Sequence, residues 1–128
     1  MTHTGLVVDP TGGVRTVQVP ESPDKAVDFI HEAIGCECFT VTVRSIEGEC
    51  FDVYCDDEAL LHDPVPLPAW YDRYGYLCGP ILILRRGEGG DSASLSDTDI
   101  ELIRASTRTA AWSTPDGCSV LGTAVVVP

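Results

Sequence analysis

Two short segments of alternating apolar residues, separated by a turn, constrain the fold of this chain more than any other feature. Residues 38–46 read CFTVTVRSI and residues 50–55 read CFDVYC, with the turn EGE between them. Because successive side chains of a strand point to opposite faces, this alternation predicts two half-buried strands joined as an antiparallel hairpin. In the second strand the pattern places Phe51, Val53 and Cys55 on one face, with Cys50, Asp52 and Tyr54 on the other.

Further strands are predicted on both sides of this hairpin. GLVVDP, which ends at Pro10, and VRTVQV are expected to form a first hairpin across the turn TGG. The apolar run GPILIL is short enough to be a buried strand. The C-terminal segment CSVLGTAVVV is predicted as the last strand, and the glycines of GEGGDSAS as a flexible hairpin loop. These segments indicate a sheet built mainly from neighbouring strands.

Two helices are indicated by capping residues and helical spacing. The first, in SPDKAVDFIHEAIG, has Ser22 as N-cap, Pro23 at its first position and Gly35 at its end. Its apolar face is predicted to contain Ala26, Val27, Ile30, Ala33 and Ile34. The second helix, SLSDTDIELIRASTRT, covers residues 94–109, and Ser96 with Asp99 forms its capping box.

The order of these elements is β-β-α-β-β-β-α-β. It predicts an α+β fold, with a mainly antiparallel sheet and two helices packed on one face. A chain of 128 residues without a linker or an internal repeat fits one domain, residues 1–128.

The formal net charge of -12 disfavours direct binding to nucleic acid or to an anionic membrane. It favours cationic partners. No apolar run approaches the ~20 residues of a membrane-spanning helix, and the N-terminal MTHTGLVVDP has no basic leader. We therefore expect a cytosolic protein in which the six cysteines are reduced thiols.

The stretch DVYCDDEALLHDPVP, residues 52–66, carries five carboxylates, and residues 45–72 contain no lysine or arginine. One interpretation is a solvated loop in which Asp56 caps a short helical turn. Another is a hard-cation site, although the spacing is not that of a calcium loop; its oxygen ligands would come from Asp56, Asp57, Glu58 and Asp63. A third is a zinc site, although CEC lacks the usual spacing; its ligands would come from Cys36, Cys38, Cys50, Cys55 and His62. The last is mimicry of the charge of DNA, which would let the acidic side occupy the basic cleft of a DNA-binding enzyme.

Sequence motifs for catalysis are missing, and recognition is better supported. The chain contains no G-x-S-x-G, H-E-x-x-H or phosphate-binding glycine loop. A Cys55–His62 pair would need hydrogen-bond contact in the fold to act as nucleophile and base. Four aromatic residues, by contrast, fall within residues 70–76 around Arg73, and such residues commonly anchor interfaces; they are Trp70, Tyr71, Tyr74 and Tyr76. The alternative is that Trp70 and one or two of the tyrosines fill the open end of the sheet.

Several of these segments also carry a resemblance to a known family: the opening strand with VVDP, the strand ending in YCDDEAL, the run GPILIL, and SLSDTDI. Together they span roughly residues 5–103. In this pattern the chain resembles a small domain of bacteriophages, plasmids and actinobacterial genomes that is catalogued as of unknown function. The resemblance implies an accessory protein carried by a mobile element. It also implies that Asp56–Glu58 form the turn from strand to loop.

We therefore interpret the chain as a non-enzymatic binding protein that engages a basic protein surface or a small planar ligand. The candidate binding residues are Asp56, Asp57, Glu58, Asp63, Trp70, Tyr71, Arg73 and Tyr74. We expect no cofactor, metal ligand or catalytic residue. The alternative is a metal- or cysteine-dependent enzyme that uses residues 52–63, which would require these side chains to converge in a pocket. A homodimer formed by pairing of an edge strand at AVVV is a third option.

Overall fold

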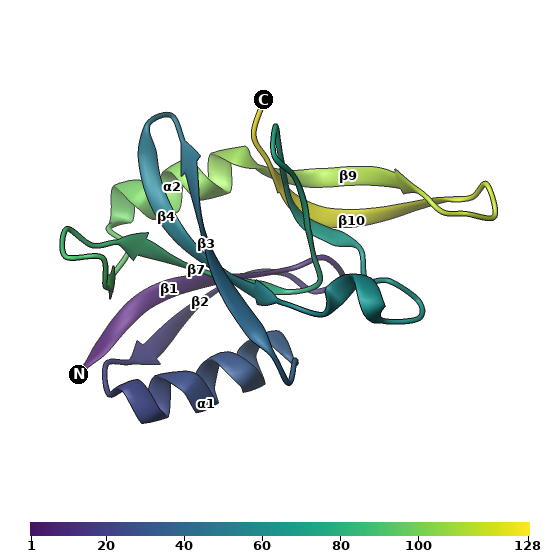
Figure 1. Ribbon diagram of the computed structural model, residues 1–128. Coiled ribbons are helices and arrows are strands. Elements are labelled where there is room, and N and C mark those ends of the chain that lie inside the picture. Colours follow the sequence, from purple (N-terminus) through teal and green to yellow (C-terminus); the bar gives the residue numbers. More distant parts are fainter.

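A computed structural model describes residues 1–128 and shows ten strands and two helices (Figure 1). The strands are β1 (Thr2–Asp9), β2 (Gly13–Pro20), β3 (Phe39–Ile46), β4 (Glu49–Asp56), β5 (Pro68–Asp72), β6 (Gly75–Cys78), β7 (Ile81–Arg86), β8 (Ser92–Ala93), β9 (Thr107–Ser113) and β10 (Ser119–Val126). The helices are α1 (Pro23–Ile34) and α2 (Asp97–Ser106), and a short 3-10 helix, η1, covers Ala59–Leu61. The predicted α+β class is confirmed. Neither α-helix is long or apolar enough to cross a membrane.

The first sheet has the order β2-β1-β7-β4-β3, with β8 paired to β7, and every pairing in it is antiparallel. The two predicted hairpins are confirmed as β1–β2 and β3–β4. Phe51, Val53 and Cys55 share one buried face of β4, as their alternation predicts.

The second sheet has the order β6-β5-β10-β9. In it, β5 runs parallel to β10, with Trp70 opposite Val125, whereas β5–β6 and β9–β10 are antiparallel. The β9–β10 hairpin extends from the body as a two-stranded ribbon (Figure 1). The segment around residues 70–76, which was predicted only as aromatic, is therefore the hairpin β5–β6.

The two helices lie on opposite faces of the first sheet, so their predicted placement on one face is wrong. Helix α1 covers the face that carries Val7 and Leu82, whereas α2 and the second sheet cover the face that carries Leu6 and Ile83. Figure 1 shows α1 below these strands and α2 above them. The reason is that β1 and β7 are apolar at successive positions. A strand without a polar face must be covered on both sides.

Helix α1 begins and ends where its capping residues predict. Pro23 is its first residue, and Gly35 ends it in the left-handed conformation, with a φ of 67°. Ile30 and Ile34 are buried as predicted. Val27 is 43% exposed, so its predicted place on the apolar face is wrong. Phe29 packs against the core instead.

Helix α2 has the predicted capping box but ends three residues earlier than expected, at Ser106 rather than Thr109. Thr107 begins β9, which pairs with β10 from Thr107 opposite Val125 to Ser113 opposite Ser119. Threonine favours strands because its branched side chain packs well on a sheet. The alternation in TRTAAWS therefore marks a strand and not a continued helix.

Strand β10 is an interior strand of the second sheet, so dimerisation through a free edge at AVVV is wrong. Val125 and Val126 pair with β5 on one side, while β9 pairs along the other side. The unpaired outer edges of the two sheets belong to β2 and β3 in the first and to β6 and β9 in the second.

Candidate functional site

The acidic segment is a fixed turn that projects carboxylates outward. Asp56, at the end of β4, accepts a hydrogen bond from the backbone N–H of Glu58, with an N–O distance of 2.8 Å. Its other oxygen lies 2.7 Å from Nε2 of His62, beyond η1. Asp56 therefore shapes the turn, although the N-cap position of η1 belongs to Glu58. Of the remaining acids of the segment, Asp57, Glu58 and Asp63 are exposed. Asp52 is buried on β4 and does not belong to this turn.

Next to these carboxylates, two leucines point into solvent. Leu60 is 74% exposed and Leu61 is 79% exposed. Both line a groove of about 420 Å³ together with Asp56, Asp57 and the side of Tyr76. The segment thus combines negative charge with unburied apolar surface.

A second groove, of about 550 Å³, adjoins the first at Tyr76 and Cys78. Its walls are the proline-rich segment 65–68 and residues 111–115 of β9 and the following turn. The ring of Tyr76 packs against Tyr71 and Trp112, with centroid distances of 4.8 Å and 5.6 Å. We call the combined area the acidic–aromatic surface; it consists of Asp56, Asp57, Glu58, Leu60, Leu61, Asp63, Tyr71, Tyr76 and Trp112.

Trp70 is not part of this surface. Its side chain is 0% exposed within the core between the sheets. Its indole Nε1–H donates to Oδ2 of Asp72 over 2.8 Å. The alternation of β5 turns Trp70 inward and Tyr71 outward, so the prediction of Trp70 as a binding residue is wrong.

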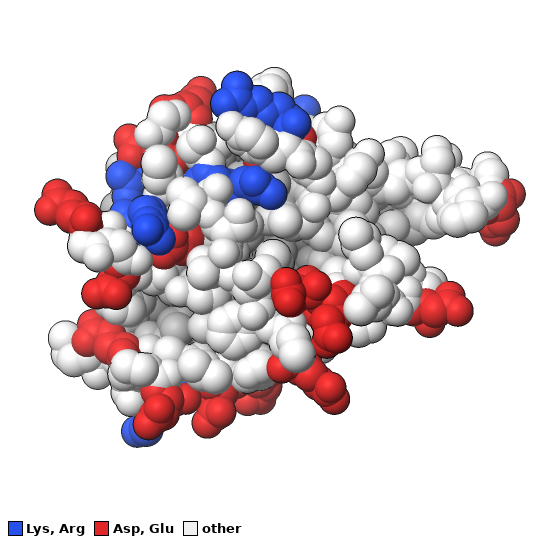
Figure 2. Space-filling view, in the orientation of Figure 1, with Lys and Arg blue, Asp and Glu red and all other residues white.

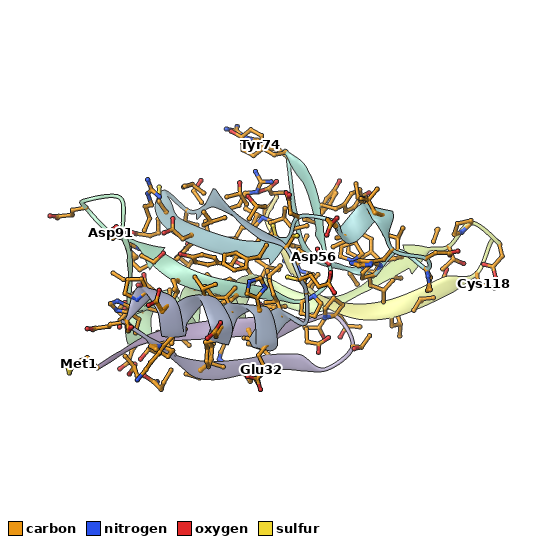
Figure 3. All side chains as sticks on the ribbon, turned by 60° about the horizontal axis from the view of Figure 1, so that its bottom comes forward. Met1, Glu32, Asp56, Tyr74, Asp91 and Cys118 are labelled. Carbon is orange, nitrogen blue, oxygen red and sulfur yellow. The ribbon has the colours of Figure 1, made fainter.

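Arg73 and Tyr74 lie at the tip of the β5–β6 hairpin, where they form a separate cluster. The guanidinium groups of Arg73 and Arg44 lie 4.9 Å and 5.5 Å from the centroid of the Tyr74 ring. Figure 3 shows Tyr74 at the far end of this hairpin, away from Asp56. The structure therefore does not bring this pair to the acidic segment.

Cys36 and Cys55 have an electrostatic setting opposite to that of a nucleophile. All six are free thiols. Burial, with the Asp56 carboxylate as a second cause, raises the pKa of Cys36 from 9.0 to about 11. Burial also raises the pKa of Cys55. A reactive cysteine needs a lowered pKa because the thiolate is the nucleophile.

The ligands proposed for a cation do not converge either. No group of three or more His, Cys, Asp or Glu side chains is placed to hold a metal ion. His62 contacts Asp56 rather than Cys55.

The raised thiol pKa values predict a loss of stability in alkaline solution. The folded state holds the Cys36 proton more tightly than the unfolded chain. This contribution is therefore complete below pH 9.0 and is lost as the pH rises through about 11. We expect the midpoint of guanidinium unfolding to fall over this window, and to fall less in Cys36→Ser, which has no thiol to ionise. An equal fall in both proteins would contradict this assignment.

Charge is unevenly distributed over the face seen in Figure 2. Most basic side chains gather at the upper left and top, with one more at the lower left, whereas acidic side chains follow the lower edge along α1 and also occur at the left. Asp24, Asp28 and Glu32 are exposed at intervals of four residues, so they form one row on this helix. This row is a second acidic area, distinct from the acidic–aromatic surface.

The predicted set lacks four residues of the acidic–aromatic surface: Leu60, Leu61, Tyr76 and Trp112. The two leucines lie between predicted acids in the sequence. Tyr76 belongs to the aromatic segment and could be placed outward once β6 is known, because it faces Tyr71 across the hairpin. Trp112 alternates within TRTAAWS. Its contact with Tyr71 depends on the parallel pairing of β5 with β10, for which the sequence carries no local signal.

Comparisons with known proteins identify a family but no function. No curated protein and no solved structure matches the chain. Residues 1–108 match the family described as "Domain of unknown function (DUF3846)". The match covers the first sheet, both helices and the β5–β6 hairpin, and ends within β9. The chain thus belongs to the DUF3846 family, a domain of unknown function.

Proposed function

We propose that this domain is an interaction module whose acidic–aromatic surface binds a basic, partly apolar segment of a partner protein. The observation that carries the proposal is that exposed Leu60, Leu61 and Tyr76 line the same groove as Asp56 and Asp57. Exposed apolar side chains that gather beside charged residues are typical of interaction sites.

The composition of the surface supports a partner of this chemistry. Tyr76 and Trp112 are large, rigid residues of the kind that carry most of the energy at interfaces. The carboxylates of Asp57, Glu58 and Asp63 would face lysine or arginine at the rim. The net charge of -12 would speed the encounter with a basic partner. In a mobile element, such a surface would let the domain occupy a basic host factor.

Charge mimicry of DNA is the second candidate, and the row Asp24, Asp28 and Glu32 on α1 favours it. Residues four apart on a helix are separated by about 6 Å along its axis, whereas duplex DNA carries a charge every ~1.7 Å. The row is therefore much less dense in charge than DNA. For this reason we prefer the acidic–aromatic surface, which adds apolar anchors to its charge.

The two candidates are separated by removing three charges from each area in turn. The probe is a fluorescent peptide that alternates lysine with leucine, and its affinity is measured by anisotropy. We expect Asp57→Asn/Glu58→Gln/Asp63→Asn to weaken binding about tenfold, because exposed charge pairs contribute about 0.2–1 kcal/mol each. The matched variant Asp24→Asn/Asp28→Asn/Glu32→Gln should change it less than about threefold, because only long-range attraction is lost.

The apolar part of the proposal is tested by Tyr76→Ala. We expect a loss of about thirtyfold, as for an aromatic anchor worth about 2 kcal/mol. A peptide of the same charge that alternates lysine with serine should bind weakly to every variant. Equal losses for the two triple variants, with no loss for Tyr76→Ala, would show non-specific charge attraction and would overturn the proposal.

A further inference from the structure

A separate cavity lies at the start of α1, whereas the acidic–aromatic surface lies beyond the end of that helix. The cavity measures about 550 Å³, within the size range of small-molecule sites. It opens between the β7–β8 hairpin and the first turn of α1, where Figure 2 shows a hollow at the lower left. Figure 3 places Met1 and Asp91 at this end of the molecule. Nothing in the proposed function uses this cavity.

One wall of the cavity is apolar and preformed. Its accessible apolar lining comes mainly from Pro20, Pro23 and Ala26. Val19, Ile30 and Leu84 complete this lining and are each at least 96% buried. These three buried residues belong to β2, α1 and β7 and pack in one apolar cluster, which fixes the backbones that carry the lining. This wall can accept an alkyl or aryl group without rearrangement of the fold.

The polar wall is a chain of hydrogen bonds that leaves only acceptors facing the cavity. Ser92 Oγ–H donates to Oδ2 of Asp52 over 2.6 Å, and Asp52 is 2% exposed. A serine hydroxyl has one proton, so Ser92 Oγ must accept the bond that joins it to Tyr54 Oη, at 2.7 Å. The Tyr54 proton is then also committed. The Tyr54 oxygen keeps its lone pairs for a ligand and has no proton to offer.

The hydrogen bonds from Tyr54 through Ser92 to Asp52 keep this donor-to-acceptor direction because Asp52 is paired with a positive charge. Arg86 Nη1 donates to Oδ1 of Asp52 over 3.2 Å, so the guanidinium neutralises the buried carboxylate. Arg86 itself does not line the cavity. The Asp52–Arg86 pair thus sets the direction of the hydroxyl chain without adding a donor to the polar wall.

The remaining polar lining is negative. Glu21 and Asp91 are exposed carboxylates at the rim, and no lysine or arginine lines the cavity. His3 is the one basic side chain of the lining, with Nδ1 at 3.9 Å from Oε1 of Glu21. Tyr54, Glu21 and Asp91 therefore offer acceptors and negative charge to anything that enters.

We propose that this cavity binds a small organic cation, a primary amine or a guanidine that carries a short alkyl or aryl body. The apolar body would rest mainly on Pro20, Pro23 and Ala26, with the buried Val19, Ile30 and Leu84 completing the apolar lining. The cationic head would donate to Tyr54 Oη and to the carboxylates of Glu21 and Asp91. A carboxylate or phosphate ligand would find no cation besides His3, and a neutral alcohol would gain no charge attraction.

The test is calorimetric titration of the full chain with phenethylamine, and with phenethyl alcohol and phenylacetate as neutral and anionic analogues of similar shape. We expect the amine to bind with a Kd below about 1 mM and at least about tenfold more tightly than either analogue. Glu21→Gln/Asp91→Asn should raise the Kd of the amine about tenfold, because both carboxylate charges at the rim are lost. Tyr54→Phe should raise this Kd about threefold to tenfold, because it removes one acceptor and keeps the ring.

The matched control is Asp57→Asn/Glu58→Gln/Asp63→Asn, which removes carboxylates outside this cavity and should leave amine affinity unchanged within about twofold. Equal binding of amine, alcohol and phenylacetate would overturn the proposal, as would amine binding that Glu21→Gln/Asp91→Asn leaves unchanged. Failure of the amine to bind would also overturn it. The peptide result at the acidic–aromatic surface is independent of each of these outcomes.

Discussion

Replacing Trp70 with alanine is expected to lower the free energy of unfolding by about 3–5 kcal/mol, the usual cost of deleting a large buried aromatic side chain. Trp70 is 0% exposed and packs in the larger of the two apolar clusters, between the sheets. The substitution opens a cavity there and removes the indole N–H group that donates a hydrogen bond to Asp72. Guanidinium unfolding followed by circular dichroism measures the change.

The matched comparison is Tyr76→Ala on the neighbouring strand. Tyr76 is 57% exposed, so its removal should cost about 1 kcal/mol or less. The two substitutions therefore separate the aromatic residue that holds the fold from one that serves the surface. Similar costs for both would contradict the assignment of Trp70 to the core and of Tyr76 to the acidic–aromatic surface.

Replacing Asp72 with alanine should lower the free energy of unfolding by about 3–5 kcal/mol, as when one partner of a buried ion pair is removed. Asp72 is 7% exposed and accepts from Trp70 Nε1 and from the backbone N–H of Tyr74, each over 2.8 Å. Its Oδ2 also lies 3.5 Å from Nε of Arg44, which has no hydrogen-bond partner. The substitution leaves both N–H groups without their acceptor and the guanidinium without its counter-charge.

Asp72→Asn separates the two parts of this cost. The amide oxygen can still accept one of the hydrogen bonds, while the charge that faces Arg44 is lost, so we expect an intermediate destabilisation. The double variant Arg44→Met/Asp72→Asn should be less destabilised than the sum of the single changes, because the two groups interact directly. Additive costs in thermal or guanidinium unfolding would show that Arg44 and Asp72 act independently.

Local signals in the sequence were sufficient for most elements of the fold. The alternation in residues 38–55 predicts β3 and β4 with the correct inward face, and Pro23 and Gly35 predict the limits of α1. Ser96 and Asp99 form the predicted capping box of α2. Each of these features depends on residues close together in the chain.

The errors concern contacts between distant segments. LVV in β1 and ILIL in β7 have no polar face. These runs indicate that both faces of the sheet are covered, so the placement of the two helices on opposite faces could have been predicted from the sequence. The pairing of β10 with β5 has no comparable signal, because parallel strands are joined by long connections. That pairing decides three outcomes: AVVV is interior, Trp70 is enclosed by two sheets, and Trp112 reaches Tyr71.

The candidate site could be predicted only in its acidic part. Asp56 to Asp63 are contiguous, so they must lie together wherever the chain runs. They share a groove with Tyr76 because the segment after β4 contacts strand β6 in the folded protein. The sequence does not predict this tertiary contact. The cavity beside Tyr54 is assembled from β1, β2, α1, β4, β7 and β8, and no single segment of the sequence marks it.

The most direct test of the central claim is a titration of the isotopically labelled domain with the lysine–leucine peptide, followed by amide and side-chain chemical shifts. We predict the largest shifts at Asp57, Leu60 and Leu61, the indole N–H of Trp112 and the amide of Tyr76, with small shifts along α1. Large shifts confined to Asp24, Asp28 and Glu32, or spread evenly over all acidic residues, would contradict the account.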